Sequence, residues 1–131
     1  MGMLSVIVAA AAAWIFGAVW YMALSKPWLE ASGIECGENG KPKTGGSPVP
    51  FILSAIAMLI VAGMMRHLFM MSGITTLGAG IVSGLGIGAF FIAPWIMINN
   101  AYGMRPFKLT AIDSGYAIFG CAIIGAVLVL I

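Results

Sequence analysis

Residues 77–98 read LGAGIVSGLGIGAFFIAPWIMI, and this stretch decides the fold. It contains no Asp, Glu, Lys or Arg, and an α-helix of this length spans the ~30 Å hydrocarbon core of a bilayer. The strands of a membrane β-barrel alternate apolar and polar residues over about ten positions, and this stretch shows no such alternation. We therefore predict a transmembrane helix here.

Three further stretches have the same character, at 3–24, 50–71 and 111–131. The chain is 62% hydrophobic and only 8% charged, whereas ordinary soluble domains are about 25% charged. So few charged side chains cannot cover a core, and lipid must therefore solvate most of the surface. We expect an all-α integral membrane protein, a compact bundle of four transmembrane helices. It forms a single domain over 1–131, with a polar loop at 25–49.

The basic residues predict the orientation, because cytoplasmic loops of membrane proteins carry an excess of Lys and Arg. Five basic residues lie on one side of the predicted helices, and Arg66 stands alone on the other. We expect loops 25–49 and 99–110 in the cytoplasm, both termini in the periplasm, and the protein in a bacterial inner membrane. The five are Lys26, Lys41, Lys43, Arg105 and Lys108.

The helix predicted over 77–98 carries glycines at four-residue intervals, which places them on one helix face. Small residues so spaced let a second helix approach closely. The favoured partner is the helix over 3–24, whose large rings recur at a seven-residue interval. We predict helix contacts by Gly80, Gly84, Gly88, Trp14, Gly17 and Tyr21. The alternative, a smooth pore-lining groove, would need oligomerisation.

The densest polar group lies between the third and fourth predicted helices. Asp113 suits the start of a helix, where a carboxylate favours the dipole. Basic side chains here could contact lipid phosphates. We predict an interfacial cluster that contacts lipid or a partner, formed by Asn99, Asn100, Tyr102, Arg105, Lys108, Asp113 and Tyr116.

One possible metal group is Met64, His67 and Met71, which share a helix face. Thioether and imidazole ligands suit Cu(I), and a lone His can ligate a haem iron. Methionine is also common filler in apolar helices, so we expect His67 at the membrane interface without a metal. The sequence predicts no cofactor and no catalytic residues. No Asp or Glu lies at the middle of a predicted helix, where proton-coupled carriers usually keep an ionisable group.

Several runs resemble the bacterial membrane family catalogued as domain of unknown function 1761. They are Trp14 to Tyr21, then Lys26-Pro27-Trp28, Ala31-Ser32-Gly33, Arg105-Pro106-Phe107-Lys108-Leu109 and Asp113-Ser114-Gly115-Tyr116, with Asn100 and Gly125. One departure is Asp113-Ser114, where the family pattern more often has Asn-Ala. The resemblance implies a small four-helix inner-membrane protein and supplies no activity.

Glycine-rich contact faces without a coupling group favour a non-enzymatic role. We predict an accessory or structural subunit of a larger inner-membrane complex. The alternative is a small oligomeric channel or transporter for a small solute, and a lipid-modifying membrane enzyme ranks last. Expected partners are membrane lipids and other integral membrane proteins or further copies of the chain. The six basic residues form no run that could follow nucleic-acid phosphates.

Overall fold

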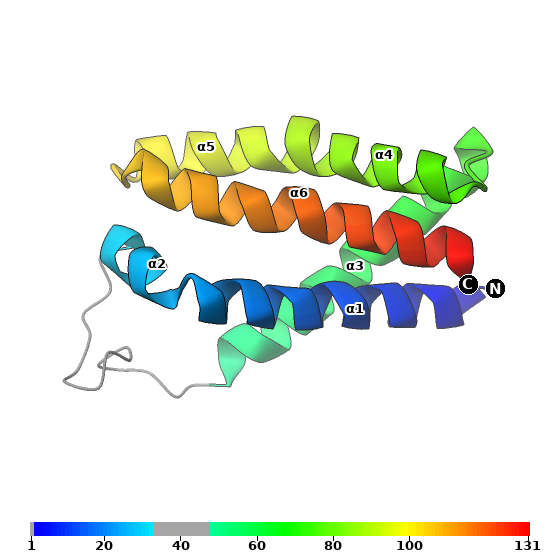
Figure 1. The fold of residues 1–131 in the computed structure, drawn as a ribbon, viewed down its shortest axis with the longest axis horizontal. Helices are drawn as coiled ribbons and strands as arrows, with labels where there is room; N and C mark the ends of the chain where they lie inside the picture. Colours follow the sequence, from blue (N-terminus) through cyan, green and yellow to red (C-terminus); the bar gives the residue numbers. More distant parts are fainter. Residues whose placement is uncertain (1, 33–47) are drawn as a thin grey trace.

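The computed structural model describes residues 2–32 and 48–131, and these form a bundle of helices without a strand (Figure 1). Four helical spans are long and apolar enough to cross a membrane. They are α1 (Gly2–Ala23), α3 (Val49–Ser72), the span Leu77–Tyr102, and α6 (Phe107–Leu130). The predicted fold class, an all-α membrane protein with a compact four-helix bundle, is confirmed.

The third span consists of α4 (Leu77–Ile87), a π-helical turn η1 (Gly88–Ile92) and α5 (Ala93–Tyr102). Pro94 explains the wider turn. A proline inside a helix has no N–H to donate, and its ring clashes with the carbonyl group four residues earlier. A π-helical turn relieves that clash without ending the helix. The span therefore continues to Tyr102, beyond the predicted end at 98.

A short helix, α2 (Ser25–Ser32), lies where the sequence suggested only an irregular loop over 25–49. It follows α1 after a break at Leu24, whose N–H still donates to the carbonyl of Trp20 at 3.0 Å. Pro27 explains the break, because its ring opposes a continuous helix through the carbonyl of Ala23. The remaining loop residues used to predict the orientation, Lys41 and Lys43, lie outside the described part of the chain.

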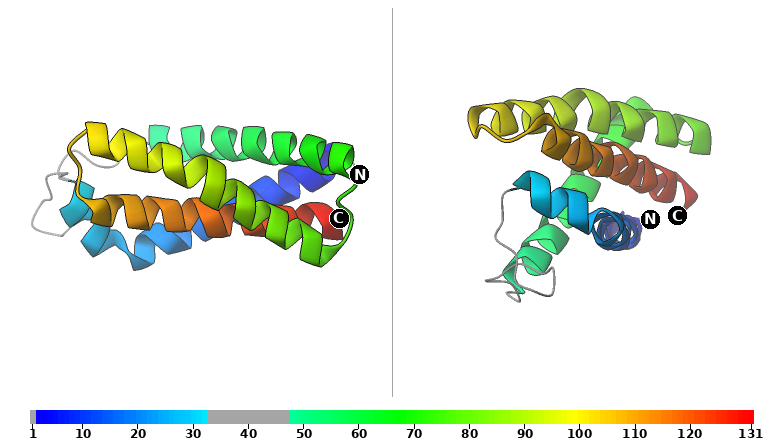
Figure 2. Two further views of the ribbon diagram at one scale, coloured as in Figure 1. Left: turned by 90° about the horizontal axis from the view of Figure 1, so that it is seen from above. Right: turned by 60° about the vertical axis from the view of Figure 1, so that its left-hand side comes forward.

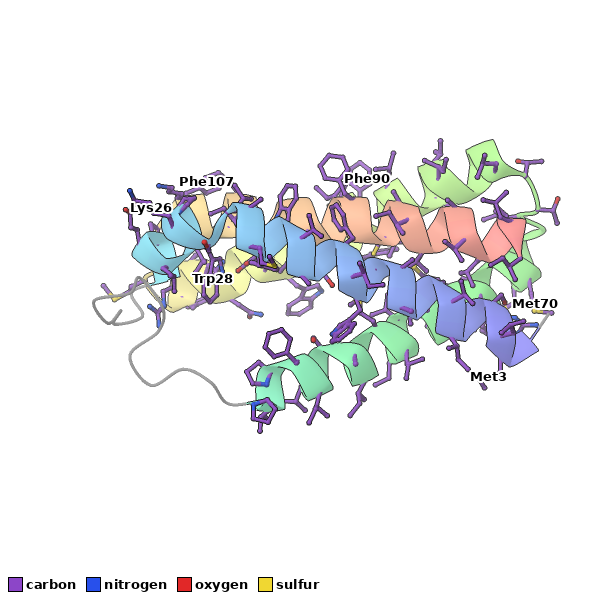
Figure 3. The ribbon with its side chains drawn as sticks, turned by 60° about the horizontal axis from the view of Figure 1, so that its bottom comes forward. Met3, Lys26, Trp28, Met70, Phe90 and Phe107 are labelled. Carbon is purple, nitrogen blue, oxygen red and sulfur yellow. The ribbon has the colours of Figure 1, made fainter. Side chains whose placement is uncertain are left out.

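The helix α6 lies at the centre of the bundle, in contact with each of the other helical elements. Figures 1 and 2 show it between α1 and the α4–α5 span, with the two termini at the same end of the bundle. Lys26 and Trp28 lie at the opposite end from Met3 and Met70 (Figure 3).

The α4–α6 contact is a close antiparallel approach of two rows of small residues. A Cβ atom added at Gly80 would lie 2.7 Å from the carbonyl oxygen of Gly125. One added at Gly88 would lie 2.6 Å from the carbonyl oxygen of Ala117. Between them, a Cβ at Gly84 would overlap the carbonyl group of Cys121. The three glycines therefore let α4 touch the backbone of α6. The expectation that the helix over 3–24 would be their partner was wrong.

The bundle is tightly packed in the half that contains the termini and more open in the other half. Ala9, Ala13, Ala62, Met65 and Ile124 are at most 2% exposed, and all belong to the core formed by α1, α3 and α6. The buried residues of α3 are confined to its second half. In its first half, α3 diverges from α5 and α6 (Figure 1), and a cavity lies beside it.

Candidate functional site

The carboxylate of Asp113 joins three helices at the open half of the bundle. Its Oδ1 accepts a hydrogen bond of 2.7 Å from the hydroxyl of Tyr21 in α1. The same oxygen accepts a second one of 3.3 Å from the indole N–H of Trp28 in α2. Asp113 lies six residues after Phe107, the first residue of α6, or about 9 Å along the helix axis. The acidic group is thus inside a membrane-type helix and faces α1.

Two aromatic rings fix the α1–α6 interface, each against a glycine of the other helix. A Cβ atom at Gly17 would lie 2.7 Å from the hydroxyl oxygen of Tyr116. A Cβ at Gly115 would lie 2.6 Å from Cζ2 of Trp20. The indole N–H of Trp20 donates to the carbonyl of Ile112 at 3.0 Å. These reciprocal contacts set the spacing between α1 and α6, and thereby bring Tyr21 to Asp113.

A cavity of about 350 Å³ lies beside this cluster, lined by residues of α1, α3, η1, α5 and α6. We call it the α3–α5 cavity. Its polar lining residues are Tyr21, Asp113 and Tyr116. The hydroxyl of Tyr116 lies 3.4 Å from the carbonyl oxygen of Ala13 and 3.4 Å from the sulfur of Met58. Most of the wall is apolar, formed by Met58, Val61, Ile92, Ile96 and Ile124 among others.

The aromatic rings at the polar end of the α3–α5 cavity form a connected group. The centroids of Tyr21 and Tyr116 are 5.5 Å apart with an interplanar angle of 74°. Those of Tyr21 and Trp28 are 5.8 Å apart at 77°. Edge-to-face pairs of this kind hold ring orientations fixed. The site therefore combines a carboxylate, fixed aromatic rings and an apolar wall, which is the composition of a small-molecule pocket.

Comparison with known protein families gives a match over most of the chain. The family model described as protein of unknown function (DUF1761) matches residues 4–129. The chain belongs to this family. The resemblance noted from its sequence runs is therefore confirmed. No curated protein and no solved structure matches the chain.

In this DUF1761 member, the predicted interfacial cluster divides into four parts. Asp113 and Tyr116 turn inward to the α3–α5 cavity. Asn100 donates to the Thr110 hydroxyl at 3.2 Å, which closes the α5–α6 turn. The ammonium of Lys108 lies 3.8 Å from the carboxylate of Glu30, and both side chains are mostly exposed. The remaining members, Asn99, Tyr102 and Arg105, are exposed residues of α5 and the turn after it.

The residues of α1 predicted to pack on the α4 glycines contact other helices. Gly17 and Tyr21 face α6, as described above. Trp14 reaches α3, where its indole N–H donates to the hydroxyl of Ser54 at 2.9 Å. Trp14 thus links α3 to α1 at the level where α3 begins to diverge from α6.

The possible metal ligands of α3 lie on its outer face. Met64 is 57% exposed and Met71 is 72% exposed, and His67 is exposed as well. Within residues 2–32 and 48–131, no three His, Cys, Asp or Glu side chains are grouped so as to hold a metal ion. Among the described residues, His67 is therefore not part of such a group.

Among the residues that hydrogen-bond across the α1–α6 interface or to the polar groups of the site, Trp20, Trp28 and Met58 were absent from the predicted set. Trp28 stands seven residues after Tyr21, so the aromatic interval in the sequence was a signal for it. Gly115 was a signal for Trp20, because a glycine inside a helix often marks a close approach. Nothing in the sequence singled out Met58 among the ten methionines.

Proposed function

We propose that this protein binds a small amphipathic molecule within the membrane, in the α3–α5 cavity. The observation that supports it is the position of Asp113, a carboxylate that lines an otherwise mainly apolar cavity of about 350 Å³. Ionisable residues inside membrane-spanning helices are expensive to place and are most often functional. Pockets for small molecules are typically about 300–1,000 Å³, apolar, with a few polar groups that fix orientation.

The proposal is for binding and not for catalysis. The carboxylate of Asp113 has a phenol and an indole as hydrogen-bond partners, and neither is a common nucleophile. Cys121 also lines the cavity, but it lies eight residues further along α6, or about 12 Å along the axis. A general base must lie within hydrogen-bond reach of the group that it activates, so these two groups do not form a nucleophile–base pair.

A cavity-filling substitution tests this proposal. Gly120 lines the cavity, and a Cβ atom there would make only an ordinary contact of 3.4 Å with the ring of Tyr116. Gly120→Leu should therefore occupy the cavity and abolish binding of small amphipathic probes by the purified protein. The matched control is Gly86→Leu, because no atom lies within 4 Å of a Cβ added at Gly86. Equal binding by both variants, with intact helix content, would refute the proposal.

The accessory-subunit role remains a second candidate, favoured by a shallow apolar groove of about 470 Å³ between α1, α4 and α6. Ala122 and Ala126 lie one turn apart in its lining, and small residues so spaced admit a second transmembrane helix. A defined partner should then co-purify in fixed stoichiometry with the native protein. Ala122→Leu should release that partner, and Gly120→Leu should not.

We propose the same membrane placement as the sequence indicated. The protein would lie in a bacterial inner membrane with both termini in the periplasm. Among the described residues, Lys26, Arg105 and Lys108 belong to the end of the bundle that would face the cytoplasm, whereas Arg66 lies near the other end. Lys and Arg accumulate on the cytoplasmic side of membrane proteins, which supports this orientation.

A further inference from the structure

The two oxygens of the Asp113 carboxylate have different surroundings. Both donors, the Tyr21 hydroxyl and the Trp28 indole, bind Oδ1. No residue within 2–32 and 48–131 donates to Oδ2. No Lys or Arg in the described part of the chain lies within ion-pair distance of this carboxylate, and Lys108 is paired with Glu30 instead. One oxygen of the acidic group is therefore available to a ligand.

The rings around this carboxylate favour positive charge. The face of an aromatic ring carries negative electrostatic potential and attracts a cation within about 6 Å of the ring centre. Tyr21 and Tyr116 both line the cavity. They are locked edge-to-face at 5.5 Å, and both rings flank the Asp113 position on α1 and α6. The polar end of the α3–α5 cavity thus places a carboxylate beside two tyrosine rings.

The opposite part of the cavity favours an apolar body. Its wall is built from aliphatic side chains and a thioether, among them Met58, Val61, Ile92 and Ile96. An anionic ligand would be repelled by the carboxylate, and a neutral one would leave it without a counter-charge. A ligand that is apolar over most of its surface and positively charged at one end satisfies both parts.

We infer that the α3–α5 cavity is a site for a compact lipophilic cation, whose ammonium-type group binds between Asp113 and the rings of Tyr21 and Tyr116. This rests on the proposed binding function and names its ligand class. The occupant is a free solute and not a zwitterionic lipid, because a lipid phosphate beside its ammonium group would be repelled by Asp113. The volume of about 350 Å³ is near the lower end of the range for small-molecule pockets, which fits a compact ligand.

A matched pair of probes tests the charge preference. Benzyltrimethylammonium and its carbon isostere neopentylbenzene have nearly the same shape and differ in charge. Binding of each is measured by equilibrium dialysis with the purified full chain in maltoside detergent, which contains no ammonium group. The cation should bind the wild-type protein about tenfold more tightly than the isostere, as expected for a carboxylate and aromatic faces acting on a desolvated cation. Asp113→Asn should remove that difference, so that the cation binds no more tightly than the isostere.

The outcomes separate the inference from the proposed function. Binding of both probes with equal affinity, lost in Gly120→Leu, would overturn the cation inference and leave the cavity as a binding site. Failure of both probes to bind would count against the binding function as well. Val61→Phe fills the same cavity from α3 and provides a second loss-of-binding variant if Gly120→Leu does not fold. A charge preference that vanishes in phosphatidylcholine nanodiscs would assign the site to a lipid headgroup and overturn the free-solute inference.

Discussion

The hydroxyl of Tyr21 donates a hydrogen bond of 2.7 Å to the carboxylate of Asp113, across 92 residues of sequence. This contact, with that of Trp28 to the same oxygen, ties the α1–α2 bend to the first turns of α6. These two hydrogen bonds fix the positions of the side chains at the polar end of the α3–α5 cavity, where α3 is no longer packed into the core. The same side chains therefore stabilise the open half of the bundle and provide the polar groups of the proposed binding site.

Removal of this hydroxyl should destabilise the bundle without changing its shape. Tyr21→Phe keeps the ring contacts with Trp28 and Tyr116 and loses only the hydrogen bond. Interhelical hydrogen bonds in membrane proteins contribute about 0.6–2 kcal/mol, so we expect a loss of about 1 kcal/mol, measured as a lower unfolding midpoint in detergent. The control is Tyr102→Phe, since Tyr102 is 88% exposed. Equal midpoints for the two variants would show that the Tyr21 contact contributes nothing.

The α4–α6 contact predicts that an alanine substitution is destabilising at Gly84 and tolerated at Gly86. Gly84→Ala places a methyl group against the carbonyl of Cys121, and backbone cannot move aside as a flexible side chain can. Gly86→Ala places the same group in open space. We expect Gly84→Ala to lower the unfolding midpoint clearly, by the equivalent of about 1–3 kcal/mol as for overpacked cores. Gly86→Ala should be neutral or slightly stabilising, because alanine has the higher helix propensity. Two equal midpoints in thermal unfolding would place the Gly84 face against lipid.

The sequence predicted that Gly80, Gly84 and Gly88 face a helix, and it could not predict which helix. Four-residue spacing determines the face from helix geometry alone. Whether α1 or α6 packs on these glycines depends on which of the two helices has a matching row of small residues in antiparallel register. That row is Ala117, Cys121 and Gly125, and its middle member is not a residue that small-residue patterns usually single out. In the α1–α6 interface, Trp20 of α1 instead packs against Gly115 of α6, and Tyr116 of α6 packs against Gly17 of α1.

The hydrogen bond between Trp14 and Ser54 should stabilise the first half of α3 against local opening. That half has mainly exposed side chains, and the Trp14 indole donates to the Ser54 hydroxyl at 2.9 Å. Ser54→Ala removes the acceptor, so amide hydrogen exchange over residues 49–60 should become faster in the detergent-solubilised protein. Residues 61–72 provide the internal control, because Ala62, Met65 and Phe69 are buried in the core. Unchanged exchange in both halves would mean that other contacts hold α3 in place.

The sequence could not predict that the Asp113 side chain faces the α3–α5 cavity, because this depends on the residue at which α6 begins. A start at 111 makes Asp113 a residue of the first turn, where a carboxylate interacts with the helix dipole. The structure starts α6 at Phe107, directly after Pro106, which has no N–H and whose fixed φ suits the residue that precedes a helix. The earlier start moves Asp113 deeper into the span. Its pairing with Tyr21 then follows from the α1–α6 contact, a tertiary feature that no local pattern encodes.

Membrane orientation is the last prediction, and cysteines engineered at two described positions test it. Cys36→Ser and Cys121→Ala first remove the native thiols. Thr75→Cys then marks the turn between α3 and α4, and Tyr102→Cys marks the end of α5. Both positions are exposed. These turns lie at opposite ends of the bundle (Figure 1), so a membrane-impermeant maleimide distinguishes them in bacterial cells with a permeable outer membrane.

Thr75→Cys should be labelled from outside in intact cells, and Tyr102→Cys only after the inner membrane is opened. The physical reason is the excess of Lys and Arg at the end of the bundle that contains Lys26, Arg105 and Lys108, which resists translocation. A reversed labelling pattern would place both termini in the cytoplasm. Replacement of Lys26 and Lys108 by Gln should reduce the charge difference and produce labelling of both cysteines from outside, as expected for a mixed population. Unchanged labelling in that double variant would show that other determinants set the orientation.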